Sequence, residues 1–91
     1  MLIMRRVHGN SMLPTLKHGQ IVIALKAKKP KANDIVIFEH DGREKIKRIQ
    51  SINKATCFFI GDNLAESTDS RSFGALPLKV IRGVVLTRRA Y

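Results

Sequence analysis

The chain has 91 residues, 44% of them apolar, and carries 17 Lys and Arg against 7 Asp and Glu, a net charge of +10. This length suits one small domain with a modest core, so we expect residues 1–91 to form a single unit. The apolar content excludes a disordered chain. The charge predicts an anionic partner, which leaves nucleic acid, an anionic membrane surface and acidic protein segments open. The lone Cys57 excludes an internal disulfide and is predicted to be buried.

Short β-branched runs predict strands along most of the chain, in order at residues 20–25, 34–40, 44–52, 57–61 and 78–89. Before them, residues 1–6 (MLIMRR) are too short for a signal-peptide core. No segment is long enough to span a bilayer, so we expect a cytoplasmic or membrane-peripheral protein. No window of 11 residues keeps a helical period. Strands this closely spaced predict a mostly β fold, a compact coiled sheet or partly closed barrel.

The Asp-Gly pair at residues 41–42 predicts a two-residue hairpin turn, because both positions of such a turn favour positive φ. In that register Val36 faces Lys47, and the lysine shares a face with Phe38 and Ile49. Lys47 is therefore expected among apolar side chains.

Two polar segments separate the predicted strands. Residues 26–33 (KAKKPKAN) form a basic connection that we interpret as a solvated loop. Residues 61–77 (GDNLAESTDSRSFGALP) form a polar loop longer than compact domains usually contain, and such loops often carry function.

Ser11 is the candidate nucleophile, and a serine needs a base. His8, His18 and His40 form no triad pattern, and the G-x-S-x-G elbow is absent. The histidines and the cysteine lack metal-ligand spacing, so we expect no metal and no cofactor. Lys47 is the other candidate base, because burial lowers a lysine pKa and Ser–Lys pairs are a known variant of the nucleophile–base arrangement.

Three motifs in the chain, in this order, resemble those of type I signal peptidases. GNSMLPTL resembles the serine motif S-M-x-P-T-L, and NDIVIF followed by IKRI resembles the strand pair that carries the lysine base. GDNLAESTDSRSFG is similar to the third motif, G-D-N-x-x-x-S-x-D-S-R-x-x-G, with every spacing kept. The resemblance implies a mostly β fold of the type shared by signal peptidases and self-cleaving repressors.

The resemblance also implies roles for individual residues. Ser11 would be the nucleophile and Lys47 the general base. Ser67 would hydrogen-bond the lysine amine, while Asp69 and Arg71 would pair to support the loop beside the site.

The implied activity is that of a serine endopeptidase removing an amino-terminal leader or propeptide after small residues. Its protein substrate would bind in extended form beside the strands. The residues expected at the substrate are Met12, Val36 and Phe38, with Met12 beneath the groove or in the core.

The chain departs from the family pattern at three points. The usual membrane anchor before the serine is missing, and only 13 residues separate Lys47 from Gly61, which leaves no room for a large inserted domain. Gly9 stands where some members have a serine that donates to the oxyanion, so the Ser11 N–H would carry more of that stabilisation; losing one such donor can cost about 10²–10³ in rate.

A short, anchor-free chain is similar to the maturation proteases of nickel-type superoxide dismutase. The alternatives are a self-cleaving-repressor-like protease domain, an inactive descendant that binds a partner, and a basic nucleic-acid-binding module. One Tyr, no Trp and four Phe leave few stacking platforms for nucleic acid, so we do not expect nucleic acid as the partner.

Overall fold

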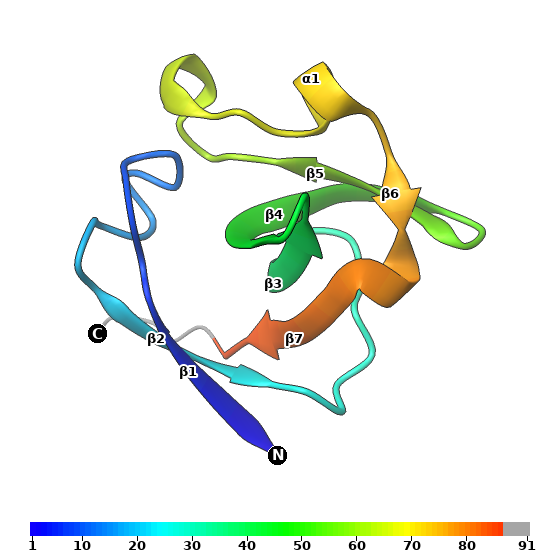
Figure 1. Cartoon of the computed structure of the whole chain (residues 1–91), viewed down its shortest axis with the longest axis horizontal. Helices are drawn as coiled ribbons and strands as arrows, with labels where there is room; N and C mark the ends of the chain where they lie inside the picture. The colour runs from blue at the N-terminus through cyan, green and yellow to red at the C-terminus, as the bar shows by residue number, and fades with distance from the viewer. Residues whose placement is uncertain (87–91) are drawn as a thin grey trace.

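The computed structural model describes residues 1–86 and folds them around one seven-stranded antiparallel sheet (Figure 1). The strands run in the order β1-β2-β7-β3-β4-β5-β6 across the sheet. Their bounds are β1 Leu2–Arg6, β2 Ile21–Leu25, β3 Ile35–His40, β4 Arg43–Asn53, β5 Thr56–Ile60, β6 Leu76–Pro77 and β7 Ile81–Val85. The prediction of a mostly β fold is confirmed.

Five of these strands lie where short β-branched runs predicted them, and the differences are local. β1 was not predicted, because its sequence LIMRR contains a single β-branched residue. The long segment 61–77 was predicted as a loop, but it holds the 3₁₀ turn η1 (Leu64–Glu66), the short helix α1 (Ser70–Phe73) and β6. The last predicted strand begins instead with a second 3₁₀ turn, η2 (Leu78–Val80), and residues 87–89 lie outside the described part of the chain.

The hairpin between β3 and β4 has the predicted register. Asp41 and Gly42 take φ values of 54° and 73°, as a two-residue turn requires. Val36 stands opposite Lys47, and Phe38 stands opposite Lys45. Local turn chemistry therefore places Lys47 opposite a buried valine.

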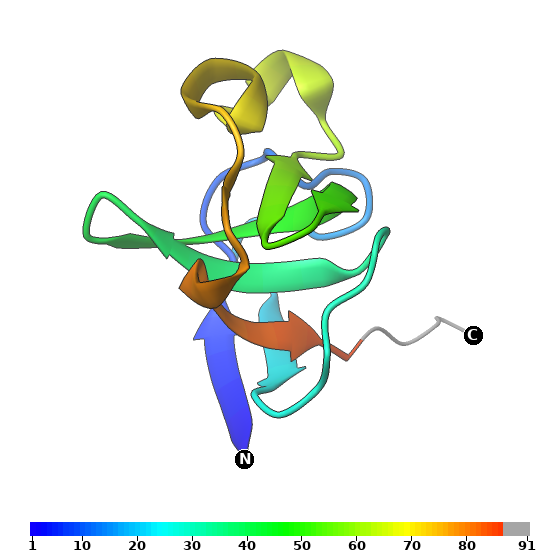
Figure 2. The same cartoon turned by 90° about the vertical axis from the view of Figure 1, so that its right-hand side faces the viewer.

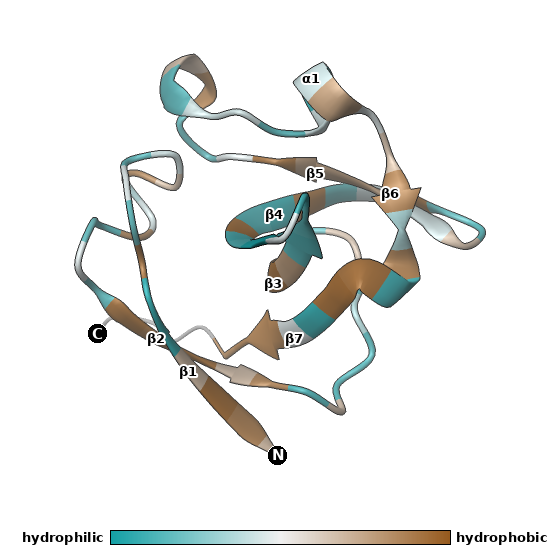
Figure 3. Cartoon of the chain, viewed as in Figure 1, coloured by the Kyte–Doolittle hydropathy of each residue, from teal (hydrophilic) through white to brown (hydrophobic). Residues whose placement is uncertain are grey.

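Strand β3 is buried on both faces and separates two apolar clusters. Alternate residues Ile35 and Ile37 join one cluster, and Val36 and Phe38 join the other. The first also contains Val7, Met12, Leu16, Val22, Ala24 and Val85, and the second Ile49, Cys57, Phe59 and Val84. Figure 3 shows the matching pattern, with apolar residues along the central strands and polar residues in the connections. The IVIF run of β3 is continuous because both of its faces are covered.

The sheet coils so that strands distant in its order meet. Arg5 of β1 and Glu44 of β4 form an ion pair, although three strands lie between β1 and β4 in the sheet. Figure 2 shows the N-terminal strands below the central hairpin, and the turn η1 and the helix α1 above it.

Cys57 is buried as predicted, and burial raises the pKa of its thiol to about 11. Within residues 1–86, no helix combines the length and the apolar character that crossing a membrane would require.

Candidate functional site

Ser11 lies in the serine loop, residues 7–20, which connects β1 to β2. The loop is closed at its base by backbone hydrogen bonds between Val7 and both Gly19 and Gln20. Met12 and Leu16 are joined by a backbone hydrogen bond and bury their side chains in the first apolar cluster. The loop is thus anchored from below, and Ser11 stays partly exposed above the anchor.

Lys47 comes from the middle of β4, and its side chain is only 7% exposed. Burial is the main cause that lowers the pKa of its amine, because a charged group loses hydration there. The positive charge of Lys45 lowers this pKa further, while the negative charge of Asp69 raises it. The net result is a lysine pKa below its ordinary value.

The two candidate catalytic side chains meet, although 36 positions separate them. Lys47 Nζ donates a hydrogen bond of 2.6 Å to Ser11 Oγ. When the amine is neutral, the same contact can reverse, with the hydroxyl donating to the nitrogen. Geometry and pKa direction therefore suit proton transfer from Ser11 to Lys47.

The segment Gly61–Asp62–Asn63 ties the serine loop to the rest of the site. The Asn63 N–H donates to the Ser11 carbonyl at 2.8 Å, and the Asn63 side chain donates to the Asn10 carbonyl at 3.0 Å. A Cβ on Gly61 would overlap Ser67 Oγ and lie 2.7 Å from the Ser11 carbonyl oxygen. Only glycine lets the two serine segments approach this closely.

Asp62 joins three elements with its carboxylate. Arg48, the neighbour of Lys47 on β4, pairs with it through two hydrogen bonds of 2.8 Å, and Thr15 of the serine loop donates at 2.6 Å. Burial would raise the pKa of Asp62, but the hydrogen bonds from Arg48 and Thr15 outweigh it, so this pKa lies below its usual range. The carboxylate therefore stays charged and links the two arms of the site.

Asp69 is fully buried and caps the N-terminus of α1. Its carboxylate accepts hydrogen bonds from the Gly61 N–H at 2.9 Å, from Ser67 Oγ at 2.6 Å and from Arg71 Nε at 2.9 Å. Burial alone would raise the pKa of Asp69, but these donors and the Arg71 N–H hold it well below the usual range. The structure brings Asp69 and Arg71 together as an ion pair.

Ser67 has a different partner from the one expected. Its hydroxyl donates to Asp69, and within residues 1–86 no hydrogen bond joins it to Lys47. The reason is competition, because a charged acceptor two residues away attracts the hydroxyl proton more strongly than an amine does. In this structure Ser67 contributes to the site by bracing Asp69.

The expectation that Val36 and Phe38 contact substrate is corrected by their burial, whereas Met12 lies in the core beneath the cleft, one of the two placements expected for it. Met12 is 1% exposed, and Val36 and Phe38 have no exposed surface at all. Phe38 stacks on Phe59 with ring centroids 3.8 Å apart. Strand alternation identified the shared face of Val36 and Phe38 correctly, but Phe59 of β5 packs on this face, so both side chains lie in the second apolar cluster.

The free surface at the site is a cleft of about 140 Å³. It is lined by both candidate catalytic residues, by the start of the serine loop and by the first half of β4: Arg6, Val7, His8, Ser11, Met12, Glu44, Lys45, Ile46 and Lys47. Its lining residues beyond Ser11, Met12 and Lys47 were not predicted, nor was the Arg48–Asp62–Thr15 link. The motifs contained Arg48 and Asp62, but nothing in their spacing shows that they pair.

Comparisons with known proteins agree with this geometry. The chain is similar to mitochondrial inner membrane protease subunit 1 of Xenopus tropicalis, with 32% identity over 83 residues, covering 81% of this chain and 50% of the relative. The chain thus spans about half the length of that curated relative. The family model described as Peptidase S24-like matches residues 1–73, which take in the serine loop, Lys47 and Asp69. With most of its length matched, this chain belongs to the Peptidase S24-like family.

Proposed function

We propose that the protein is a serine endopeptidase in which Ser11 is the nucleophile and Lys47 the general base. The observation that carries the proposal is the 2.6 Å contact between Ser11 Oγ and the amine of a buried lysine. A lysine serves as a base only when it is neutral near the working pH, and burial favours the neutral form. Membership of a peptidase family supports the same reaction class.

The proposed reaction proceeds in two steps. Lys47 takes the proton of Ser11 as Oγ attacks the scissile carbonyl carbon, and the protonated amine then gives this proton to the leaving amine as the peptide bond breaks. In the second step Lys47 takes a proton from the water that attacks the Ser11 ester, and it returns this proton to Ser11 Oγ as the ester bond breaks and the acid leaves. Nucleophile and base are regenerated.

Stabilisation of the oxyanion is assigned to the backbone N–H of Ser11. Within residues 1–86 this N–H has no acceptor, so it is available to a bound carbonyl. Gly9 has a φ of +84°, which an L residue rarely adopts, and its own N–H donates to His18 at 2.8 Å. The conformation at Gly9 therefore supports the assignment of the oxyanion to the backbone N–H of Ser11. A residue with a donating side chain at position 9 would require a different loop conformation.

The substrate is proposed to bind as an extended strand between β1 and β4. One edge of β1 is unpaired because β1 ends the sheet, and β5 pairs with β4 only from Arg48 onward. The first half of β4 therefore also has a free edge, next to Ser11 and Lys47. An inserted peptide would gain backbone hydrogen bonds from both edges, and a cleft of about 140 Å³ favours small side chains beside the scissile bond.

The narrower assignment is to peptidases that remove an amino-terminal leader or propeptide. It rests on the three signal-peptidase motifs and on the similarity to an inner membrane protease subunit. Within that group, the narrower likeness that we propose is to the maturation proteases of nickel-type superoxide dismutase, which trim the amino-terminal extension of one partner protein.

Two alternatives would give different results in the same incubation with peptides. A self-processing domain of repressor type would cleave its own chain in preference to added peptide. A basic nucleic-acid module would cleave neither, and the burial of Phe38 and Phe59 removes two of the four phenylalanines from any stacking surface.

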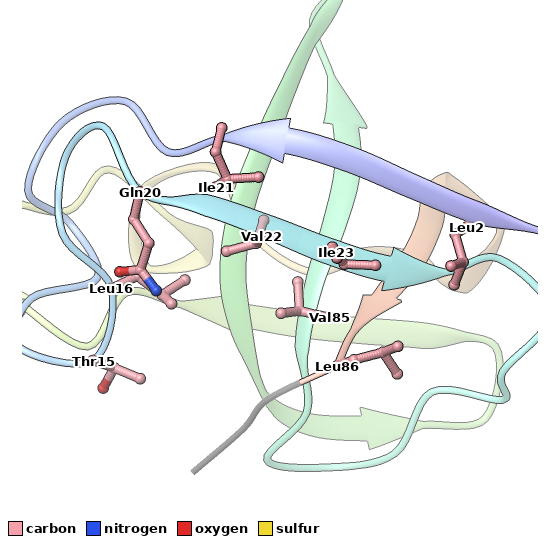
Figure 4. Close-up of a pocket in the computed structure, with 9 residues that line it drawn as sticks. All are labelled: Leu2, Thr15, Leu16, Gln20, Ile21, Val22, Ile23, Val85 and Leu86. Atoms are coloured by element: carbon pink, nitrogen blue, oxygen red, sulfur yellow. The ribbon is translucent and has the colours of Figure 1, made fainter. Parts of the chain in front are cut away.

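A second proposal concerns contact with an anionic membrane surface. The outer face of β1 and β2 exposes Leu2, Met4, Ile21 and Ile23, and Leu86 continues it. Figure 4 shows Leu2, Ile21, Ile23 and Leu86 around a hollow of about 610 Å³. The basic connection 26–33 begins at the edge of this face, where the Lys26 N–H donates to the Met1 carbonyl. Apolar side chains beside exposed lysines match the interface of an anionic bilayer.

Replacing either dyad residue should abolish cleavage without unfolding the protein. Ser11→Ala and Lys47→Met should each lower kcat by roughly 10⁴-fold or more. Lys47→Arg should not restore activity, because a guanidinium stays protonated. The assay is cleavage of peptides with small residues at the first and third positions before the bond, with Ser51→Ala and Lys54→Arg as matched surface controls. Near-normal activity of Lys47→Arg would exclude lysine as the base.

The rate should rise with pH through the lowered pKa of Lys47. Below that pKa the amine is charged and cannot accept a proton, so kcat/KM should show one rising limb in the neutral to mildly alkaline range. Stability should also rise over this window, because the unfolded lysine, with a pKa near ~10.4, holds a proton that the folded one has lost. The free energy of unfolding, obtained from urea titrations at several pH values, measures this rise in the wild type, and Lys47→Met should not show it. A limb centred near ~6.5 would point to a histidine base instead.

Asp69→Asn should lower both stability and activity. The amide keeps the shape but loses charged hydrogen bonds, at a cost of about 1.5–3 kcal/mol. Because the folded pKa of Asp69 is depressed, its stabilisation is complete above the unfolded value of about 3.9 and is lost as pH falls below it. In Asp69→Asn, this decrease of stability at acidic pH should be absent. Asp41→Asn in the hairpin turn is the matched control; an unchanged melting temperature with lost activity would make Asp69 a catalytic residue.

Binding to phosphatidylglycerol–phosphatidylcholine vesicles tests the membrane proposal. Ile23→Glu should weaken cosedimentation roughly tenfold or more, because it replaces a side chain that would enter the interface. Leu64→Glu is the matched control, since Leu64 is exposed on η1 and lies outside this face. Added salt should weaken binding by the wild type. Equal binding by the two variants, or none by the wild type, would rule the proposal out.

A further inference from the structure

A second lysine shares the face of β4 that carries Lys47. Lys45 stands two residues earlier and opposite Phe38, and side chains two apart on a strand point to the same side. Lys45 is half-buried and lines the same cleft as Ser11 and Lys47. Its charge therefore lies beside the proposed base, on the side away from Ile49.

The ammonium of Lys45 is held in place by an aromatic ring. Lys45 Nζ lies 5.7 Å from the centroid of Phe73, the last residue of α1. The ring of His40 stacks on the same phenyl ring with centroids 4.2 Å apart, which holds Phe73 in turn. A ring face attracts a cation, so Phe73 holds the Lys45 ammonium in place on the face of β4 that carries Lys47.

We propose that Lys45 is a positioning residue whose fixed positive charge keeps Lys47 in the neutral form that accepts the Ser11 proton. This rests on the proposed dyad of Ser11 and Lys47. Two like charges side by side repel, and of the two ammonium groups the buried one is the easier to discharge.

The other charged groups around Lys47 are largely neutralised by partners. Asp69, which opposes the effect, is paired with Arg71, and Glu44 is paired with Arg5. Arg48 is paired with Asp62 and Glu39 with Arg82, and the other charged or titratable groups on the adjoining segments are Arg6, His8, His40 and Arg43. Within residues 1–86, Lys45 forms no ion pair. The direction of the Lys47 pKa agrees, since the Lys45 charge lowers it after burial does.

The test compares Lys45→Met, which removes the charge, with Lys45→Arg, which keeps it and can still stack on Phe73. Lys54→Met in the turn between β4 and β5 is the control for losing one positive charge far from the cleft. Lysine titration by NMR follows the Lys47 pKa directly, and kcat/KM against pH follows its effect on cleavage. In Lys45→Met the Lys47 pKa and the midpoint of the kcat/KM profile should each move to higher pH by about 0.5–1 unit. At a pH below the rising limb of that profile, this shift corresponds to roughly a three- to tenfold loss of rate. The rate on the alkaline plateau should stay unchanged.

Two control variants and the ionic strength distinguish an effect of the Lys45 charge from other effects of the substitution. Lys45→Arg and Lys54→Met should keep the wild-type position of the limb, and raised ionic strength should move the limb alkaline in the wild type but less in Lys45→Met. An unchanged Lys47 titration in Lys45→Met would overturn the proposal. So would a loss confined to KM for acidic peptides, because Lys45 would then be a substrate-binding residue. A shifted titration in a protein that cleaves nothing would uphold the coupling and refute the proposed peptidase activity.

Discussion

A carboxylate without exposed surface organises the site. Asp69 can stay charged inside the protein only because several donors surround it, and each donor belongs to a segment that the site needs in place. Gly61 begins the segment that hydrogen-bonds the serine loop, Ser67 packs against that glycine, and Arg71 opens the turn of α1. Losing any of these donors would leave part of a buried charge unsatisfied. The carboxylate of Asp69 therefore holds the loop 61–73 at three points along its length.

The second link, between Asp62 and Arg48, fixes the relative position of the two halves of the dyad. Arg48 follows Lys47 directly on β4, and alternation along the strand sends the two side chains to opposite faces. One face carries the amine into the site, while the other face pairs with Asp62 and, through it, with Thr15 of the serine loop. The Lys-Arg dipeptide thus places its first side chain against Ser11 and its second against Asp62.

The sequence was most informative where structure is decided locally. The Asp-Gly turn sets the register of one hairpin, and that register alone placed Lys47 opposite Val36. β1 could not be predicted, because LIMRR becomes a strand through pairing with β2, whose residues lie about 20 positions later. Alternation also showed which face Val36 and Phe38 occupy, but not that Phe59 of β5 covers that face. In both cases the missing information is a contact with a segment distant in sequence, which a local pattern does not contain.

In the proposed mechanism, the distribution of charge at the cleft would let a chain with many basic residues use one of them as a base. The nearby carboxylates, Asp69 and Glu44, are each held by an arginine, whereas the Lys45 ammonium lies over an aromatic ring and within the described residues forms no ion pair. The cleft is therefore electropositive, which disfavours a proton on Lys47. The same field would favour the negative charge that develops on a carbonyl oxygen in the proposed attack by Ser11. Because Gly9 has no side chain that could donate to the oxyanion, the proposed mechanism would rely on this one arrangement of charges both to keep Lys47 neutral and to stabilise the oxyanion.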